Sequence, residues 1–278
     1  MSLASDLESA VFDRVPQRAT PIIDAHAHVG PYSEFFIPSC EPADLVRVMD
    51  RVGVDKTVLS SHLGIQLDAR RGNEATAEAV AAHPDRLAGY LVVNPWQHPV
   101  DELARWADDP RFVGIKLHPD LHMYPLTGPH YTPVWEFAER TGCPVLTHTW
   151  TGSEYDDLAH IGVVADRHPG VTLLAGHAGA SYAGFDTAIE VAAAHPRVLL
   201  EICGSHNSGA TIARMVRALG PSQVVFGSDF PFIDLRCSLG RMVFAELDDA
   251  DRAAVLGGTA QRLFGWRSPP ATDRTDKE

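Results

Sequence analysis

The sequence predicts an α/β fold in which eight parallel strands alternate with eight helices. Short apolar segments alternate with amphipathic or alanine-rich segments along nearly the whole chain. Eight such pairs can be recognised, each roughly 30 residues long, the usual size of a strand–helix–strand unit. Strands that alternate with helices form a parallel sheet. Eight units in about 250 residues are typical of a closed (β/α)8 barrel, the TIM barrel.

The expected strands are short apolar runs, and most of them end in a polar or glycine-containing segment. This pattern is typical of a buried parallel strand followed by a loop. In chain order the eight strands are expected at residues 21–28, 54–61, 86–94, 112–119, 144–150, 171–179, 197–204 and 223–231.

The expected helices lie between these strands. Three of them end in a histidine that precedes a proline, at His83, His168 and His195. A polar residue in the last turn followed by proline is a helix stop signal, so we assign these histidines a structural role. The eight helices are expected at residues 42–53, 73–84, 100–109, 132–142, 157–169, 185–196, 209–220 and 238–249.

The pattern indicates one domain, and the chain of 278 residues is long enough to bury a large core. We expect residues 19–266 to form the barrel and residues 1–18 to be an N-terminal extension. After the eighth unit, residues 250–266 are again helical in character and supply the additional C-terminal helix. Residues 267–278, RSPPATDRTDKE, are expected to be a disordered tail.

Composition excludes several classes of function. A formal net charge of −13 disfavours a nucleic-acid partner, which needs a basic surface. No segment has the roughly 18 consecutive apolar residues that a membrane span requires. The first residues, MSLASDLESAVFDRV, lack the basic start and apolar centre of a signal peptide, and there are four cysteines without a CxxC pair. We therefore expect a cytoplasmic protein that acts on a small molecule, and a homodimer is compatible with this.

Polar side chains gather where the expected strands end. Catalytic residues of a (β/α)8 barrel come from the C-terminal ends of its strands. Histidines, one lysine and one aspartate from distant parts of the chain would therefore meet at one mouth of the barrel. These residues are His26, His28, His62, Lys116, His118, His148, His177 and Asp229.

The pair His26 and His28 is the first sign of a metal site. Residues i and i+2 of a strand point to the same side, so the two rings can chelate one ion. Taken alone, other strand-end residues have ordinary explanations: Asp229 as a turn or helix-capping residue, His148 as a hydrogen-bonded core histidine and His177 as part of a tight turn. Their coincidence at the ends of strands in a pattern of eight strand–helix units favours a metal centre.

The order HxH, KxHP, TH, GH and GSDFP resembles the metal-dependent amidohydrolase superfamily. The most similar branch includes aminocarboxymuconate semialdehyde decarboxylase and related enzymes of small molecules. The resemblance runs from about residue 20 to residue 266, with Thr259 where the family often has asparagine. It implies a TIM barrel with one divalent metal, zinc first and manganese or iron as alternatives. The implied metal ligands are His26, His28, His148 and Asp229.

The resemblance also implies catalytic roles at the metal. A bound metal lowers the pKa of its water towards neutrality. Asp229 would accept the proton of that water, and His177 would orient the water or stabilise developing charge.

Lys116 leaves three interpretations open. It can bind an oxygen of the substrate, it can be carbamylated and bridge two metals, or it can pair with a buried acid such as Asp24 or Glu201. His118, Tyr32 and His62 are further candidates for substrate contact, because they belong to the strand ends and the loop at residues 30–42. Aromatic side chains in that loop suit a flat organic substrate.

The preferred function is a metal-dependent hydrolase of an ester, lactone or amide. The alternative is a metal-dependent decarboxylase of an aromatic or muconate-type acid. It is disfavoured by the lack of lysine and arginine in the loop at 30–42, although Arg70, Arg71 and Arg236 are substitutes. A metal-dependent nuclease conflicts with the acidic composition, and a non-catalytic metal-binding barrel is the remaining alternative.

Overall fold

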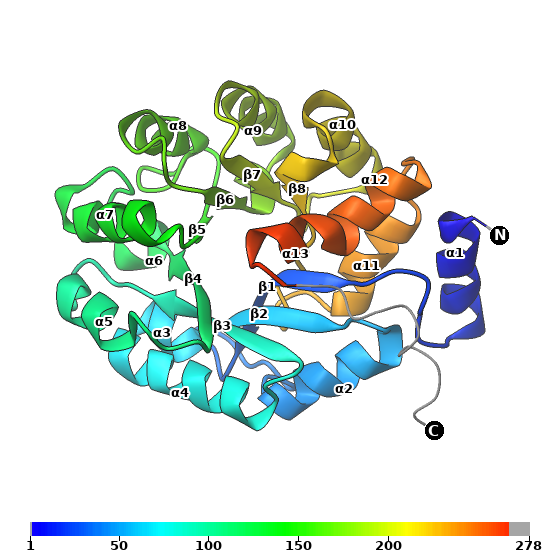
Figure 1. Cartoon of the computed structure of the whole chain (residues 1–278), viewed down its shortest axis with the longest axis horizontal. Coiled ribbons are helices and arrows are strands. Elements are labelled where there is room, and N and C mark those ends of the chain that lie inside the picture. The colour runs from blue at the N-terminus through cyan, green and yellow to red at the C-terminus, as the bar shows by residue number, and fades with distance from the viewer. Residues whose placement is uncertain (1, 267–278) are drawn as a thin grey trace.

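The computed structural model describes residues 2–266, so the tail expected at 267–278 lies outside the described residues. Eight strands form one parallel sheet in which each pairs with its neighbours in chain order. Figure 1 shows this sheet rolled into a barrel with helices around it, as the sequence predicts. The strands are β1 (Ile23–Val29), β2 (Lys56–Ser61), β3 (Leu87–Val92), β4 (Phe112–Leu117), β5 (Val145–His148), β6 (Leu173–Gly176), β7 (Val198–Glu201) and β8 (Val224–Val225).

The eighth strand is much shorter than residues 223–231, where we expected it. After Val225 the chain leaves regular pairing with β7 but stays hydrogen-bonded to β1. The Ala25 amide donates to the Phe226 carbonyl at 2.9 Å, and the His28 amide donates to the Phe230 carbonyl at 2.6 Å. These bonds join the last segment of the barrel wall to the first.

The helices form the outer layer of the barrel (Figure 1). The regular ones are α1 (Leu3–Asp13), α2 (Pro42–Val52), α3 (His62–Gln66), α4 (Ala69–Ala82), α5 (Pro99–Trp106), α6 (Pro119–His122), α7 (Thr132–Thr141), α8 (Leu158–Arg167), α9 (Tyr182–Ala194), α10 (Gly209–Leu219), α11 (Leu235–Val243), α12 (Asp249–Ala253) and α13 (Thr259–Leu263). Short 3-10 turns η1 (Pro129–Tyr131), η2 (His177–Gly179) and η3 (Pro221–Gln223) and the π-helical turn η4 (Ala254–Gly258) complete the set.

Several helices begin or end at the capping residues that the sequence provides. His83, His168 and His195 are the C-cap residues of α4, α8 and α9, which confirms their assignment as stop residues. The helix expected at 238–249 is instead split. Asp234 caps the start of α11, and Asp248 caps a separate α12, so two N-caps replace one continuous helix.

The first and last described helices are both held against the barrel. At the N-terminus, the amides of Leu3 and Ala4 donate to the carboxylate of Asp249 at 2.8 and 3.1 Å, which fixes α1 to α12. At the C-terminal end, Ala260 of α13 packs with buried strand residues from the barrel interior. The described helices include none that is long and apolar enough to cross a membrane.

His122 illustrates how the barrel rim buries titratable groups. It ends α6, is buried, and its Nδ1 lies 2.9 Å from the Tyr131 hydroxyl. Burial lowers its pKa from 6.5 to about 4. Between these two pH values the His122 imidazole binds a proton in the unfolded chain but not in the folded protein. The free energy of unfolding must therefore fall as the pH drops from 6.5 towards 4.

We predict that His122→Asn, which can keep the contact to Tyr131, makes the protein less sensitive to acid. Between about pH 7 and about pH 4.5, the variant should lose about 2 kcal/mol less free energy of unfolding than the wild type. Urea unfolding at the two pH values measures this. His98→Asn, at an exposed histidine, is the control and should behave as wild type. Equal acid sensitivity of the His122 variant and wild type would contradict the prediction.

Candidate active site

A cavity of about 390 Å³ opens at the C-terminal ends of the strands. Side chains from β1, β4 and β5 reach it, as do His177 directly after β6 and residues of the turn that follows β8. Eight of the residues proposed from the sequence line it: His26, His28, Tyr32, Lys116, His118, His148, His177 and Asp229. Segments far apart in the sequence therefore meet where the barrel fold predicts.

The three histidines proposed as metal ligands each have one ring nitrogen occupied by a neighbour. In every case the occupied atom is Nδ1, and the partner is a carboxylate or a hydroxyl. A carboxylate at Nδ1 keeps the hydrogen there and leaves Nε2 as the nitrogen that can bind a metal. The pairs are His26 with Glu201 at 2.7 Å, His28 with Ser60 at 3.0 Å and His148 with Asp156 at 2.7 Å.

Asp229, which follows β8, adds a carboxylate to these three histidines. Its Oδ1 lies 3.4 Å from His28 Nε2 and 3.8 Å from His26 Nε2. Its backbone adopts φ +61°, which is uncommon for a residue other than glycine. The Asp229 amide donates to the His26 carbonyl at 2.8 Å, and this bond holds the turn in that conformation.

Burial keeps the site histidines neutral. It lowers the pKa of His26 and His28 well below the usual value, and the nearby charge of Lys116 acts in the same direction. The pKa of His148 falls to about 4 and that of His177 to about 3, again mainly through burial. Neutral imidazole is the form that binds a divalent metal.

Lys116 lines the cavity and is almost fully buried. Its Nζ is 2.7 Å from His26 Nε2. In the described part of the chain it makes no ion pair with Asp24 or Glu201, the acids proposed as partners. The Lys116 amine and a metal would use the same lone pair of His26, so the two contacts exclude each other.

Glu201 and Cys203 form a buried layer beneath the histidines that we did not assign to the site. From the sequence, Glu201 is a candidate only as a partner for Lys116, and Cys203 has no assigned role. The Cys203 thiol lies 3.2 Å from Nδ1 of both His26 and His177 and donates to Glu201 Oε2 at 2.9 Å. Two polar residues spaced i, i+2 at the end of an apolar strand were the available signal.

One group of possible ligand atoms includes Cys203 together with His26, His177 and Asp229. We favour the set His26, His28, His148 and Asp229, because Cys203 does not line the cavity. Burial and the neighbouring Glu201 also raise the pKa of the Cys203 thiol well above its usual value, and only the thiolate is a good ligand. Cys203 thus supports the two rings from below.

Aromatic rings cover the cavity. His118 stacks on His148 with 4.1 Å between ring centroids, and Tyr32 packs edge-on against Phe232 at 4.8 Å. Both Phe232 and Trp150 line the cavity, although neither was singled out from the sequence. These aromatic rings add flat faces to a cavity whose lining is otherwise a mixture of polar and apolar side chains.

His62 does not lie on the cavity wall, where we expected it to contact substrate. It is the first residue of α3, so the chain turns as soon as β2 ends. Its ring stacks behind His28 at 5.0 Å, and its Nδ1 bonds the Gly30 carbonyl at 2.6 Å. The structure gives His62 a packing position next to a candidate ligand.

A comparison with known protein families shows to which family the chain belongs. A family described as amidohydrolase matches residues 23–266, almost the whole barrel. The chain belongs to the amidohydrolase family. This confirms the resemblance seen in the HxH and GSDFP motifs.

Two similar proteins of known activity are decarboxylases. The chain is 23% identical over 251 residues to gamma-resorcylate decarboxylase of Rhodococcus jostii, covering 70% of this chain and 76% of that protein. It is 22% identical to gamma-resorcylate decarboxylase of a Rhizobium species, covering 79% of this chain and 85% of that one.

Solved structures share the fold. A 5-carboxyvanillate decarboxylase from Sphingomonas paucimobilis superposes with a TM-score of 0.71 at 18% identity, covering 89% of this chain and all of that one. A dihydroxybenzoic acid decarboxylase from a Polaromonas species, with bound manganese and 2-nitroresorcinol, gives 0.69 at 18% identity, covering 91% and 99%. The TIM barrel is therefore established for this chain.

The cavity fits a divalent metal. Neutral imidazoles with Nδ1 already bonded, next to one carboxylate, are a suitable donor set for such an ion. With Glu201 bound to His26 beneath the site, the metal affinity should depend on that carboxylate, although it is not itself a ligand.

We predict that Glu201→Gln weakens metal affinity by about 10–100-fold, because an amide holds the hydrogen on His26 Nδ1 less firmly than a carboxylate does. Competition with a chromophoric chelator measures this. Glu246→Gln, at an acid remote from the cavity lining, is the matched control and should bind metal as wild type. Unchanged affinity in a folded Glu201→Gln variant would show that the carboxylate does not support the ligand.

Proposed function

We propose that the protein is a metal-dependent decarboxylase of an aromatic acid. The observation that carries the proposal is the cavity itself, in which aromatic walls surround a group of potential metal ligands and a single buried cation, Lys116. The decarboxylases among the related proteins support this choice. It corresponds to the alternative that the sequence placed second, and the comparisons favour it over hydrolysis.

Among the described lining residues, Lys116 offers the positive charge for an anionic substrate, beside the acids Glu34, Asp120 and Asp229. Lys116 is the cavity's sole lysine or arginine among the described lining residues. None of the basic residues considered as substitutes reaches it: Arg71 does not line it, Arg70 pairs with Glu102, and Arg236 pairs with Asp234. We therefore assign the substrate carboxylate to Lys116, which loses its contact to His26 when that ring binds a metal.

Decarboxylation of an aromatic acid requires a proton at the ring carbon that carries the carboxylate. As the carbon–carbon bond breaks, its electron pair returns to the ring and carbon dioxide leaves. We assign this proton to the carboxyl group of Asp229, which would donate it to the ring carbon and regain one from solvent water after carbon dioxide leaves, and the neutral ring of His177 would hydrogen-bond a substrate oxygen. When bound to His26, His28, His148 and Asp229, a divalent metal supplies the positive charge that binds and polarises the substrate oxygens.

The identity of the metal belongs to the same proposal. Zinc was our first expectation, but manganese is the ion in the related Polaromonas structure. Imidazole and carboxylate donors suit both ions, and the assigned set contains no thiolate that would favour zinc. We therefore propose manganese or zinc, to be separated by the activity that each restores to metal-free protein.

The direct test is release of carbon dioxide. We predict that the metal-loaded protein converts 2,6-dihydroxybenzoate or 5-carboxyvanillate with formation of one carbon dioxide per substrate consumed. Gas-phase detection together with chromatography of the aromatic product measures this. A parallel panel of aryl esters, lactones and amides tests hydrolysis. Turnover of that panel without carbon dioxide from any hydroxybenzoate would restore the hydrolase interpretation.

We predict that Lys116→Met lowers kcat/KM for the aromatic acid by about 10–100-fold while the metal content stays the same. A lost charge-assisted hydrogen bond accounts for this range. Steady-state kinetics and elemental analysis of the same sample measure both quantities. Loss of a second metal would indicate the carbamate bridge instead. Unchanged kinetics would show that Lys116 does not contact the substrate.

A further inference from the structure

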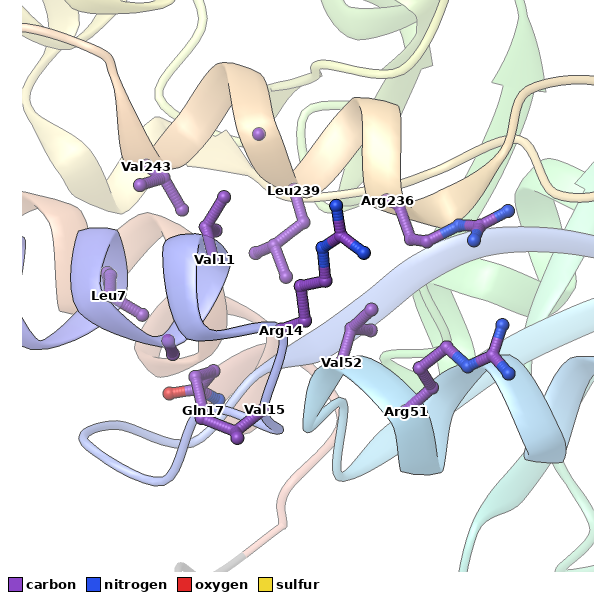
Figure 2. Close-up of a pocket in the computed structure, with 12 residues that line it drawn as sticks. Leu7, Val11, Arg14, Val15, Gln17, Arg51, Val52, Arg236, Leu239 and Val243 are labelled. Atoms are coloured by element: carbon purple, nitrogen blue, oxygen red, sulfur yellow. The ribbon is translucent and has the colours of Figure 1, made fainter.

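A second cavity lies on the outside of the barrel, between α1, α2 and α11 (Figure 2). Its volume is about 510 Å³, within the range of small-molecule sites. None of the residues from these three helices lines the active-site cavity, so the two cavities are separate. Its occupant has to be inferred from its own walls.

The walls are divided into an apolar end and a cationic end, as Figure 2 shows. Leu239 lies between the two ends and is itself buried. The apolar end is formed by Leu7, Val11 and Val243, and the cationic end by the guanidinium groups of Arg14, Arg51 and Arg236.

The charge at the cationic end is only partly compensated. Arg236 pairs with Asp234 at 2.5 Å, whereas Arg14 and Arg51 make no ion pair within residues 2–266. The protein as a whole carries a net charge of −13, whereas the described lining of this cavity contains three arginines and no acid. Such a site attracts an anion, and guanidinium groups bind carboxylates particularly well.

We propose that this cavity binds a small amphipathic anion, namely a carboxylate with an aliphatic body. The carboxylate would lie between Arg14 and Arg51, and the body would extend past Leu239 towards Leu7 and Val11. The apolar end disfavours a fully polar ion as the ligand, since the polar side chain that lines the cavity beside it, Gln17, already donates to the carbonyls of Thr20 and Gly53. The site is independent of the activity proposed above.

Octanoate is a suitable probe, with 1-octanol as its neutral counterpart. We expect one octanoate per chain in calorimetric titration of the metal-loaded protein. Because charge-assisted hydrogen bonds are missing for the alcohol, 1-octanol should bind at least about tenfold more weakly. Equal affinity for the two compounds would show that the arginines play no part, and would overturn the proposal.

Two variants locate the binding. Arg14→Gln combined with Arg51→Gln removes two exposed, unpaired charges, so the fold is preserved. The double variant should bind octanoate at least about tenfold more weakly. Val11→Asp, which places an acid at the half-exposed apolar end, should weaken it as well. Arg217→Gln, at an exposed arginine outside the cavity, is the matched control and should leave octanoate affinity unchanged.

Two other results would overturn the proposal. Undiminished octanoate binding in the double arginine variant would place the ligand elsewhere, for example in the active-site cavity. The absence of saturable binding, together with a dimer in sedimentation that Val11→Asp dissociates, would show that a second copy of the chain covers this surface.

Discussion

The candidate site depends on how the first and last segments of the barrel meet. The buried carboxylate of Asp24 accepts hydrogen bonds from the Ser228 amide and hydroxyl at 2.9 and 2.5 Å. One residue further on, the Asp229 amide reaches the His26 carbonyl. Gly227 allows this approach, because a Cβ there would collide with Glu201. The ring nitrogens of β1 and the carboxylate after β8 thus face each other only because the closure is tight, and mispositioned ligands would cost affinity.

Burial away from water determines the protonation state of the histidines at this closure. A group of histidines exposed to water would be partly protonated near neutral pH and would repel a cation. In the barrel mouth, burial holds the same rings neutral, while Glu201 and Asp156 accept from their Nδ1 atoms. Burial raises the pKa of Glu201 to about 8, and the hydrogen bonds from Cys203 and from the His177 amide oppose this by favouring the carboxylate. Each layer therefore stabilises the next: the carboxylates orient the rings, and the rings present Nε2 to the cavity.

The sequence predicts the regular part of this arrangement and fails where the chain is irregular. Strand-and-helix alternation and strand-end positions were sufficient to place His26, His28, His148 and Asp229 at one mouth. His62 was misplaced because α3 begins at that residue, and a helix of one turn leaves no periodic pattern to read. Asp156 comes from the loop after β5, where neither spacing nor periodicity marks a partner for His148. Phe232 likewise follows the turn at Asp229, whose conformation no residue pattern specifies.

Because of the position of α1, substitutions that alter the outer cavity differ from those that alter the active site. This helix precedes the first strand and lies outside the repeating units, yet it supplies one wall of the outer cavity and is attached through Asp249 (Figure 1). Substitutions on its exposed side alter that wall without touching any strand end. Natural variation in α1 can therefore change what the outer cavity binds while the residues at the barrel mouth, and the reaction that they catalyse, stay the same.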